Sequence, residues 1–526
     1  MSYATDLNPS SCAEPKRGMV AGRGGGYGYK IDDEERLRRF LILGHEGGTY
    51  YAGQRELTFE TVDCIDRFMG MSEGIDTVAR IIVEISDGGR APKNDPAIFA
   101  LAYLASKGGY CAEAAYEALP KVCRIGTHLF QFISYCKQLG KGWGTGFRRA
   151  VNNWYLQRSP LSVAKQVTKY KNRHGWTHRD VFRKSHPQAD YNMNGVIRYV
   201  TQPEAWANET RLFDEAGKYL LAVERAKYAS IHDLCKLIRE FRLPREVIPT
   251  ERLDNKDVWM ALLESMPLTA MIRNLGKMSN IELVAPLSRA SKMVVEKLQD
   301  REALRAQRVH PLTLLIAEKT YARGRGVRGS LSWRVDQKVL KALDDAFYAS
   351  FDLVEPTGKN FLLGVDVSGS MGWHTCCGCD ILSPREAAAA MAMLAARTEP
   401  NSYIVAFCHV LQELNITSND SLNTVLKKIS GLRFGATNCA APIEYASEHN
   451  LDVDVFCIYT DNETNYGPHP SSALQSYRKR NPNAKLAVFG LAQTGFTVAD
   501  PNDPGMMDFV GFDTASPTLL ADFARS

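Results

Sequence analysis

The hydrophobic pattern of the chain changes once, near Glu355-Pro-Thr-Gly358, and this change constrains the fold more than any other feature. Before it, from Ile31 to about Val354, apolar residues recur at spacings of three and four, as in Val258, Leu262 and Met266. That spacing is typical of amphipathic helices, and few runs alternate with a period of two. The first part of the chain therefore predicts successive helices with short breaks at Gly or Pro.

These helices have no strict sequence period. A stack of helix pairs, like a degenerate helical solenoid, is the natural way to bury so many amphipathic helices. We therefore predict a helical-repeat domain over residues 31–355. Residues 1–30 are rich in Pro, Ser and Gly and end in GRGGGYGY, so we expect a disordered tail there.

After Gly358, short apolar runs alternate with helical ones, which predicts a parallel sheet covered on both faces, an α/β doubly wound domain over residues 356–526. The first helix carries a capping box of Ser383 and Glu386, with Pro384 between them. The expected strands are 361–367, 402–408, 453–459 and 485–491, and further helices are expected at 421–430, 442–449 and 472–480.

Polar side chains follow the strands where ligands bind in such sheets, at the carboxyl ends. Asp366 ends the first strand, and the next turn adds the hydroxyls of Ser368 and Ser370. Thr437 and Asp461 lie in two other loops at the same predicted edge. Hard divalent cations prefer clustered oxygen ligands, so these residues predict a metal site, for which we expect Mg²⁺. On the first strand alone, a plain polar turn is an equally good interpretation.

Several enzymatic interpretations fit these residues poorly. A two-metal nuclease needs more carboxylates, and only Glu463 is spare. An aspartyl phosphotransferase would need a second acid in place of Ser368, and Gly358-Lys359 lacks the Ser or Thr of a P-loop. We therefore expect a binding site and no enzyme. The nearby cluster at His374, Cys376, Cys377 and Cys379 lacks the usual zinc-ligand spacing, so plain loop thiols are expected.

One helical segment, residues 141–186, is strongly basic. It holds eleven Lys and Arg but a single acid, Asp180, and so carries +10, whereas the whole chain carries +5. Such side chains neutralise phosphates, and the interleaved aromatic residues could stack on unpaired bases or face the core. The charge predicts a surface for RNA or another polyanion.

Composition restricts the compartment. The 12 cysteines have no even spacing, which suits a reducing, intracellular environment. The N-terminus lacks the apolar stretch of a signal peptide, and the longest apolar run, 387–396, is too short to span a bilayer. We expect a cytoplasmic protein with no membrane contact, with a nuclear fraction if the source is eukaryotic.

Motifs along both parts of the chain resemble those of one family. The set Asp366, Ser368, Ser370, Thr437 and Asp461 is similar to the metal-ion-dependent adhesion site of von Willebrand factor A domains. The segments RFLILGHEGGTYY, CRIGTHLF, VTKYKNRHGWTHRD, MPLTAMIRNLGKM and RVHPLTLLIA, followed by EPTGKNFLLGVDVSGSM and YTDNET, resemble the Ro 60 kDa autoantigen (Rsr) family of TROVE-domain proteins. These motifs occur in order from about residue 31 to the end.

The resemblance implies a ring of HEAT-like helical repeats whose ends are joined by the A domain. It also implies that 3′ single-stranded ends of misfolded RNAs pass through the ring, and that Y-like non-coding RNA binds a basic outer face. Bacterial relatives work with the exoribonuclease polynucleotide phosphorylase. The implied RNA-binding positions are Lys169, Arg173 and His186, and charge adds Arg148, Arg149, Lys171, Arg179 and Arg183.

The sequence thus predicts a non-enzymatic RNA-binding ring protein that serves RNA quality control or delivers RNA to a nuclease. The alternative is a metal-dependent, adhesion-type scaffold that grips an acidic side chain of a protein ligand. A Mg²⁺-dependent nuclease or phosphatase is the further alternative.

Overall fold

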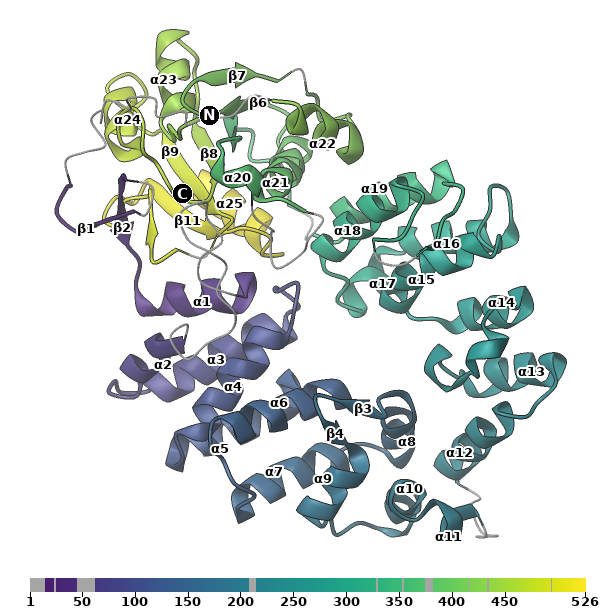
Figure 1. Cartoon of the computed structure of the whole chain (residues 1–526). Helices are drawn as coiled ribbons and strands as arrows, with labels where there is room; N and C mark the ends of the chain where they lie inside the picture. Colours follow the sequence, from purple (N-terminus) through teal and green to yellow (C-terminus); the bar gives the residue numbers. More distant parts are fainter. Residues whose placement is uncertain are drawn as a thin grey trace, which may run out of the picture.

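The computed structural model describes residues 15–22, 25–44, 62–207, 214–327, 330–351, 354–373, 382–414, 416–432, 435–492 and 494–526. They form a helical array followed by a sheet domain (Figure 1). The cysteine cluster predicted near His374 lies outside these residues, so its prediction stays open.

The array begins with α1 (Asp33–Leu43) and ends with α19 (Gln337–Ala349). Between them lie α2 (Asp63–Phe68), α3 (Gly74–Asp87), α4 (Asp95–Ser106), α5 (Gly109–Val122), α6 (Gly126–Gln138), α7 (Thr145–Leu156), α8 (Pro160–Lys169), β3 (Asn172–Arg173), β4 (Trp176–Thr177), α9 (His178–Ser185), α10 (Tyr191–Thr201), α11 (Pro203–Ala207), α12 (Glu215–Ala226), α13 (Ile231–Phe241), η3 (Arg245–Val247), η4 (Thr250–Arg252), α14 (Lys256–Ser265), α15 (Leu268–Asn280), α16 (Arg289–Gln299), α17 (Arg301–Ala306) and α18 (Pro311–Ala322).

Helix α14 illustrates why these segments are helical. The Asn255 side chain caps its first turn by accepting hydrogen bonds from two backbone amides, and the buried face carries Val258 and Leu262. The helix stops at Met266, because the next residue is Pro267. Full burial of one such aliphatic side chain contributes about 1.5–3 kcal/mol, so packing into the array stabilises a helix too short to persist alone. The helical spacing predicted here is confirmed.

The sheet domain holds β5 (Phe361–Asp366), β6 (Ser402–Phe407), β7 (Leu411–Glu413), β8 (Val455–Thr460), β9 (Lys485–Gly490) and β11 (Met506–Val510). They form one sheet in the order β11-β9-β8-β5-β6-β7, parallel except for the edge strand β7. Its helices are α20 (Ser370–Trp373), α21 (Pro384–Thr398), α22 (Leu422–Ser430), α23 (Ala441–Glu448), α24 (Pro470–Tyr477) and α25 (Ser516–Arg525).

Both faces of this sheet are covered. Successive residues of the central strand β5 point to opposite faces: Leu362 joins the cluster of α23 and α24, and Leu363 joins the one that includes α21. The four predicted strands and the doubly wound architecture are confirmed, as is the capping box of Ser383 and Glu386.

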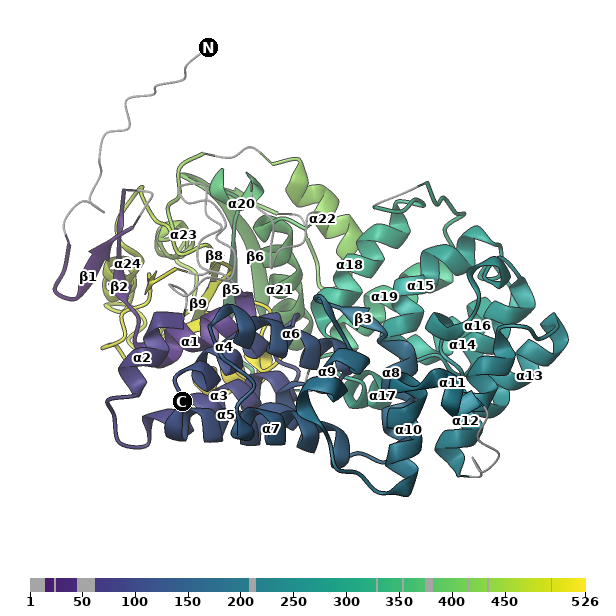
Figure 2. The same ribbon diagram turned by 60° about the horizontal axis from the view of Figure 1, so that its bottom comes forward.

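The predicted disordered tail is wrong for two segments. Strands β1 (Met19–Ala21) and β2 (Tyr27–Lys30) form a three-stranded antiparallel sheet with β10 (Phe496–Thr497) of the sheet domain. Figures 1 and 2 both show β1 and β2 beside that domain, near α24. The glycines permit this close packing, because a Cβ on Gly28 would lie 2.5 Å from the Phe496 ring. Residues 1–14 lie outside the described residues.

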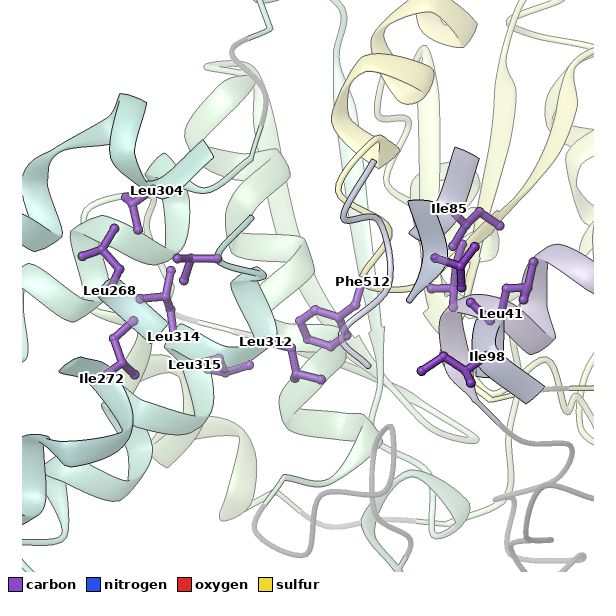
Figure 3. Packing of buried hydrophobic residues seen from close by; sticks show 14 of the residues in the cluster. Leu41, Ile85, Ile98, Leu268, Ile272, Leu304, Leu312, Leu314, Leu315 and Phe512 are labelled. Carbon is purple, nitrogen blue, oxygen red and sulfur yellow. The ribbon is translucent and has the colours of Figure 1, made fainter. Parts of the chain in front are cut away.

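The two ends of the array meet at the sheet domain. Arg308, just before α18, pairs with Asp87 at the end of α3 at 2.8 Å. The buried imidazole of His310 lies close to two backbone carbonyls, with Nε2 3.2 Å from Arg90 O and 3.0 Å from Phe512 O. In Figure 3, Phe512 lies between Leu312 on one side and the residues of α1, α3 and α4 on the other. The predicted architecture, a helical-repeat array whose ends the A-type domain brings together, is confirmed.

Among the described residues, no helix has the length and apolar character needed to cross a membrane. The eight described cysteines are all buried free thiols.

Candidate nucleic-acid interface and candidate metal centre

Eight predicted RNA-binding residues lie on adjacent elements of the array, and we call them the basic face: Arg148, Arg149, Lys169, Lys171, Arg173, Arg179, Arg183 and His186. They come from α7, the end of α8, the β3–β4 hairpin and α9, which Figure 1 shows together. Hydrogen bonds join these elements, since Asn152 of α7 donates to the Ser185 carbonyl at 2.9 Å. Seven of the eight side chains are exposed, and Lys169 is half-buried.

The charge of the basic face is not neutralised locally. Within the described residues, no carboxylate lies within 4.0 Å of a cationic atom of these eight side chains. The single acid of the segment, Asp180, is used elsewhere: its carboxylate accepts from the Thr177 amide and hydroxyl at the start of α9. A surface with unpaired cations raises the local potential and attracts polyanions.

Most aromatic residues of the segment are not available to stack on bases. Phe147, Trp154, Tyr155, Trp176 and Phe182 are buried in the array, whereas Trp143 and Tyr170 are half-buried. The interpretation of these rings as core residues is therefore correct for the buried five.

A histidine of the segment is also part of the core. His178 is buried at the start of α9, its Nδ1 lies 2.8 Å from the Tyr155 hydroxyl, and burial lowers its pKa to about 3. His178 thus adds no positive charge near pH 7.

Two cavities adjoin one another further along the array. One, of about 890 Å³, is lined by residues of α15 and α18, by the 92–93 connection and by Trp333. The other, of about 300 Å³, lies between α8, α12 and α15. Arg245 and Asn274 line both, and the exposed cations Arg242 and Arg273 lie beside them. The linked cavities offer cationic and aromatic groups of the kind that bind single strands.

The predicted metal-binding residues lie at the carboxyl edge of the sheet. Asp366 ends β5, Asp461 follows β8, and all five side chains are at least 95% buried. Asp366 Oδ1 accepts from the Ser368 amide at 2.8 Å, and the hydroxyls of Ser368 and Ser370 lie 3.1 Å apart. Burial raises the pKa of Asp461, and a hydrogen bond with the Ser370 hydroxyl lowers it by a smaller amount. Four of the five predicted side chains thus converge.

Thr437 reaches the same edge through its backbone. Its amide donates to the Asn465 side chain at 2.8 Å, and the nearby Gly435 carbonyl accepts from Gly369 at 3.3 Å. Among the described residues, no hydrogen bond joins its hydroxyl to the other four side chains. The structure therefore places Thr437 beside the site and buries it there.

Two residues that support this site were not predicted. Thr460 donates its hydroxyl to Asp366 Oδ2 at 2.8 Å. The buried Arg385 of α21 donates to the carbonyls of Val367 and Ser368, at 2.9 and 3.1 Å, and so holds the turn after β5. Thr460 could have been found from its place next to Asp461, whereas Arg385 had no signal in the sequence around the site.

The electrostatics of the site suit a cation. Burial, and then the charge of Asp461, raise the pKa of Asp366, and burial raises that of Asp461. Asp461 Oδ2 is buried and has no hydrogen-bond partner among the described residues. Among the described residues, no group of three His, Cys, Asp or Glu side chains could hold a metal ion. A metal site at this edge of the sheet therefore needs hydroxyl oxygens as ligands. Two buried carboxylates and clustered hydroxyls fit a hard divalent ion.

Comparison with known proteins identifies the family. The sequence matches the TROVE domain over residues 20–233 and 236–320, and the Ro60 vWA domain over 360–524. It is 38% identical to the RNA-binding protein RO60 of Deinococcus radiodurans, over 99% of this chain and 98% of the relative. The chain belongs to the Ro60 family.

Other members give the same result for this Ro60-family protein. The RNA-binding protein RO60 of Caenorhabditis elegans is 32% identical, over 98% of this chain and 91% of the relative. The crystal structure of the Deinococcus radiodurans RO (RSR) protein superposes with a TM-score of 0.70 and 37% identity, covering 94% of this chain and 99% of that one. The predicted family is confirmed. The basic face lies within the TROVE match, and the oxygen site lies within the vWA match.

Proposed function

We propose that this Ro60-family protein binds RNA on its basic face and catalyses no reaction. The RNA is a small structured non-coding RNA of the Y type. The observation that carries the proposal is the set of exposed cations on α7, α9 and the β3–β4 hairpin, for which the described residues provide no carboxylate partner. Lys and Arg that face phosphates release counterions, which supplies most of the affinity in such interfaces.

We further propose that misfolded small RNAs bind with their duplex part on the basic face and their 3′ single strand at the linked cavities. Half-buried Lys169 belongs to the basic face and also lines the smaller cavity, so the two surfaces are continuous. Arg245 and Asn274 extend this path to the larger cavity with Trp333. The protein would thereby serve RNA quality control, with handover to an exoribonuclease such as polynucleotide phosphorylase in a bacterial cell.

Isolation of the RNA that co-purifies with the protein tests this function. We expect a few structured small RNAs to dominate the sequenced pool from the wild-type protein. A variant with Lys169, Arg173 and His186 replaced by Ala should lose them. The matched control replaces the exposed Lys292 and Lys338 of α16 and α19, and it should retain them. Equal recovery from all three proteins would reject the proposal.

A second function rests on the buried, unpartnered Oδ2 of Asp461. Asp366, Ser368, Ser370, Thr437 and Asp461 would hold Mg²⁺, which when bound supplies a positive charge that an acidic side chain of a protein ligand can approach. The protein residues fix the oxygens and exclude water, as Arg385 and Thr460 do by holding the turn and the Asp366 carboxylate.

Thermal unfolding with Mg²⁺ tests this second function without any assay of activity. Binding to the folded state stabilises it by about 2.7 kcal/mol when the ion concentration is a hundredfold above the dissociation constant. We expect Mg²⁺ to raise the Tm of the wild-type protein and to leave that of Asp461→Asn unchanged. An equal effect on both proteins would exclude the site.

The absence of catalysis has a direct test as well. Labelled RNA incubated with the pure protein and Mg²⁺ should remain intact. Specific cleavage products that Asp461→Asn abolishes would instead establish a metal-dependent nuclease.

A further inference from the structure

The N-terminal hairpin, which consists of β1, β2 and the turn between them, packs on the loop that follows Asp461. The Gly22 amide closes the turn by donating to the Gly26 carbonyl at 2.7 Å. A Cβ on Gly26 would lie 1.6 Å from the Thr464 carbonyl oxygen, and one on Gly22 would lie 2.6 Å from Glu463 Oε2. Only glycine fits at these two positions, so the backbone of the turn lies directly on the loop.

A second set of contacts anchors the hairpin on α24, away from this loop. The hydroxyl of buried Tyr29 lies 3.2 Å from Ser471 Oγ. Its ring meets the His469 ring edge to face, with 5.7 Å between the centroids. Strand β2 also pairs with β10, where Tyr29 lies opposite Thr497. These contacts keep the turn against the 463–465 loop without involving the loop itself.

The 463–465 loop is bonded in turn to two of the five predicted metal-binding residues. The Glu463 amide donates to Asp461 Oδ1 at 3.1 Å. The Asn465 side chain accepts from the Thr437 amide at 2.8 Å, and the Asn465 amide donates to the Thr437 carbonyl at 2.9 Å. The loop therefore fixes the Asp461 carboxylate and the backbone that carries the Thr437 hydroxyl.

The backbone of this region is strained and needs support from outside. Asn462 has a φ of 67°, a left-handed conformation that a residue other than glycine keeps only where its surroundings hold it. Its own side chain gives little support. Oδ1 accepts from the Thr497 hydroxyl and the Val498 amide at 3.4 and 3.5 Å, and buried Nδ2 has no partner among the described residues. The hairpin turn packs on the residues directly after Asn462 and so supplies such support.

We propose that the N-terminal hairpin positions the divalent-ion site and sets its preference for Mg²⁺. The inference rests on the proposed metal binding and gives the glycine-rich segment a role in it. Mg²⁺ requires nearly ideal octahedral coordination at short distances, whereas Ca²⁺ accepts a more flexible set of ligands. A hairpin that holds Asp461 and Thr437 in place therefore favours the smaller ion. Gly26 and Tyr29 are positioning residues, because they act through the loop and are not ligands.

Calorimetric titration of the folded full chain with Mg²⁺ alone and with Ca²⁺ alone tests the inference. Measured well below the melting temperature, the dissociation constant does not change with a mere loss of stability. Loss of a group that supports metal ligands raises the dissociation constant roughly 10- to 100-fold. We expect Gly26→Ala to weaken Mg²⁺ binding by that factor and Ca²⁺ binding by less. Tyr29→Ala frees the hairpin from α24 and leaves the turn glycines unchanged. It should have the same effect, and it is the second variant if Gly26→Ala fails to fold.

The matched control makes the same substitution at a crowded glycine of the array. A Cβ on Gly276 of α15 would lie 2.9 Å from the Trp333 ring. Gly276→Ala should therefore disturb packing in the array, and the affinities for both ions should stay at the wild-type values.

The outcomes separate this inference from the function on which it rests. If the wild-type protein binds neither ion, the proposed metal site fails, and this inference fails with it. If the wild-type protein binds Mg²⁺ and folded Gly26→Ala and Tyr29→Ala bind it equally well, the metal site stands and the role of the hairpin is rejected. An equal loss of affinity for the two ions would overturn its role in the preference for Mg²⁺. The same loss in Gly276→Ala would overturn the assignment to the hairpin.

Discussion

Removal of two cations from the basic face should change the salt dependence of RNA binding by a predictable amount. Lys169→Ala combined with Arg173→Ala is the chosen variant. The Arg173 side chain is exposed and donates to the backbone carbonyl of its neighbour Asn172, and Lys169 Nζ lies 5.4 Å from the centroid of the Tyr170 ring. Neither side chain is part of the core, so the fold should persist.

The magnitude follows from the number of permanently charged side chains. The basic face carries seven Lys and Arg, and each that meets a phosphate of a duplex contributes about −0.9 to the slope of log K against log salt. With all seven in contact the slope is about −6, and loss of two makes it about −4.5. Between about 50 and 200 mM salt, the wild-type affinity should fall about 12-fold further than that of the variant.

Filter binding of one structured small RNA over this salt range measures both slopes. Circular dichroism should give the same helical signal and melting curve for the two proteins. The control replaces Lys292 and Lys338, exposed lysines on the distant helices α16 and α19, and should keep the wild-type slope. An unchanged slope in the Lys169 and Arg173 variant would refute the claim that these side chains face phosphates.

Three further predictions concern the scaffold. Gly364→Ala should lower the free energy of unfolding by about 1–3 kcal/mol, because the new Cβ would lie 2.7 Å from Pro442 Cγ. An unchanged denaturant midpoint would show that Pro442 moves away without cost. Burial, and then the charge of Asp344, raise the pKa of Glu318 to about 7, so its ionisation penalises the folded state as pH rises from 4.5 through 7. Glu318→Gln should therefore be more stable than the wild-type protein above pH 7, by up to about 3 kcal/mol, with a gain that vanishes toward pH 4.5; a pH-independent gain in urea titrations would exclude this cause. Arg39→Ala should lower the free energy of unfolding, measured in urea titrations, by about 3–5 kcal/mol, because buried Arg39 pairs with Asp508 across the contact between α1 and the sheet domain. A loss below about 1 kcal/mol would mean that this ion pair does not stabilise the contact.

Local signals predicted most of the sheet domain. The strand at 361–366 is a short buried run that is apolar up to Val365, and the capping box at Ser383 depends on residues three positions apart. The N-terminal strands could not be predicted in this way. The outer partner of β2, β10, is more than 460 residues away in the chain, and the glycines that resemble a linker permit close packing. A Cβ on Gly26 would lie 1.6 Å from the Thr464 carbonyl oxygen.

The residues of the candidate sites also differ in whether the sequence could predict them. Asp366 and Asp461 could be placed together because the carboxyl ends of parallel strands share one edge. Arg385 could not, since its contact with the turn depends on how α21 packs on the sheet. On the array, charge composition located the basic face, but the smaller of the linked cavities requires α8, α12 and α15 to be packed together.

Ultraviolet cross-linking of the purified protein to its co-purifying RNA, followed by mass spectrometry of the cross-linked peptides, locates the RNA-binding surface on the protein. We expect cross-links within residues 141–186, above all in peptides that carry Lys171, Arg173 and Arg179. Cross-links confined to the sheet domain, or to array helices remote from α7 and α9, would contradict this expectation.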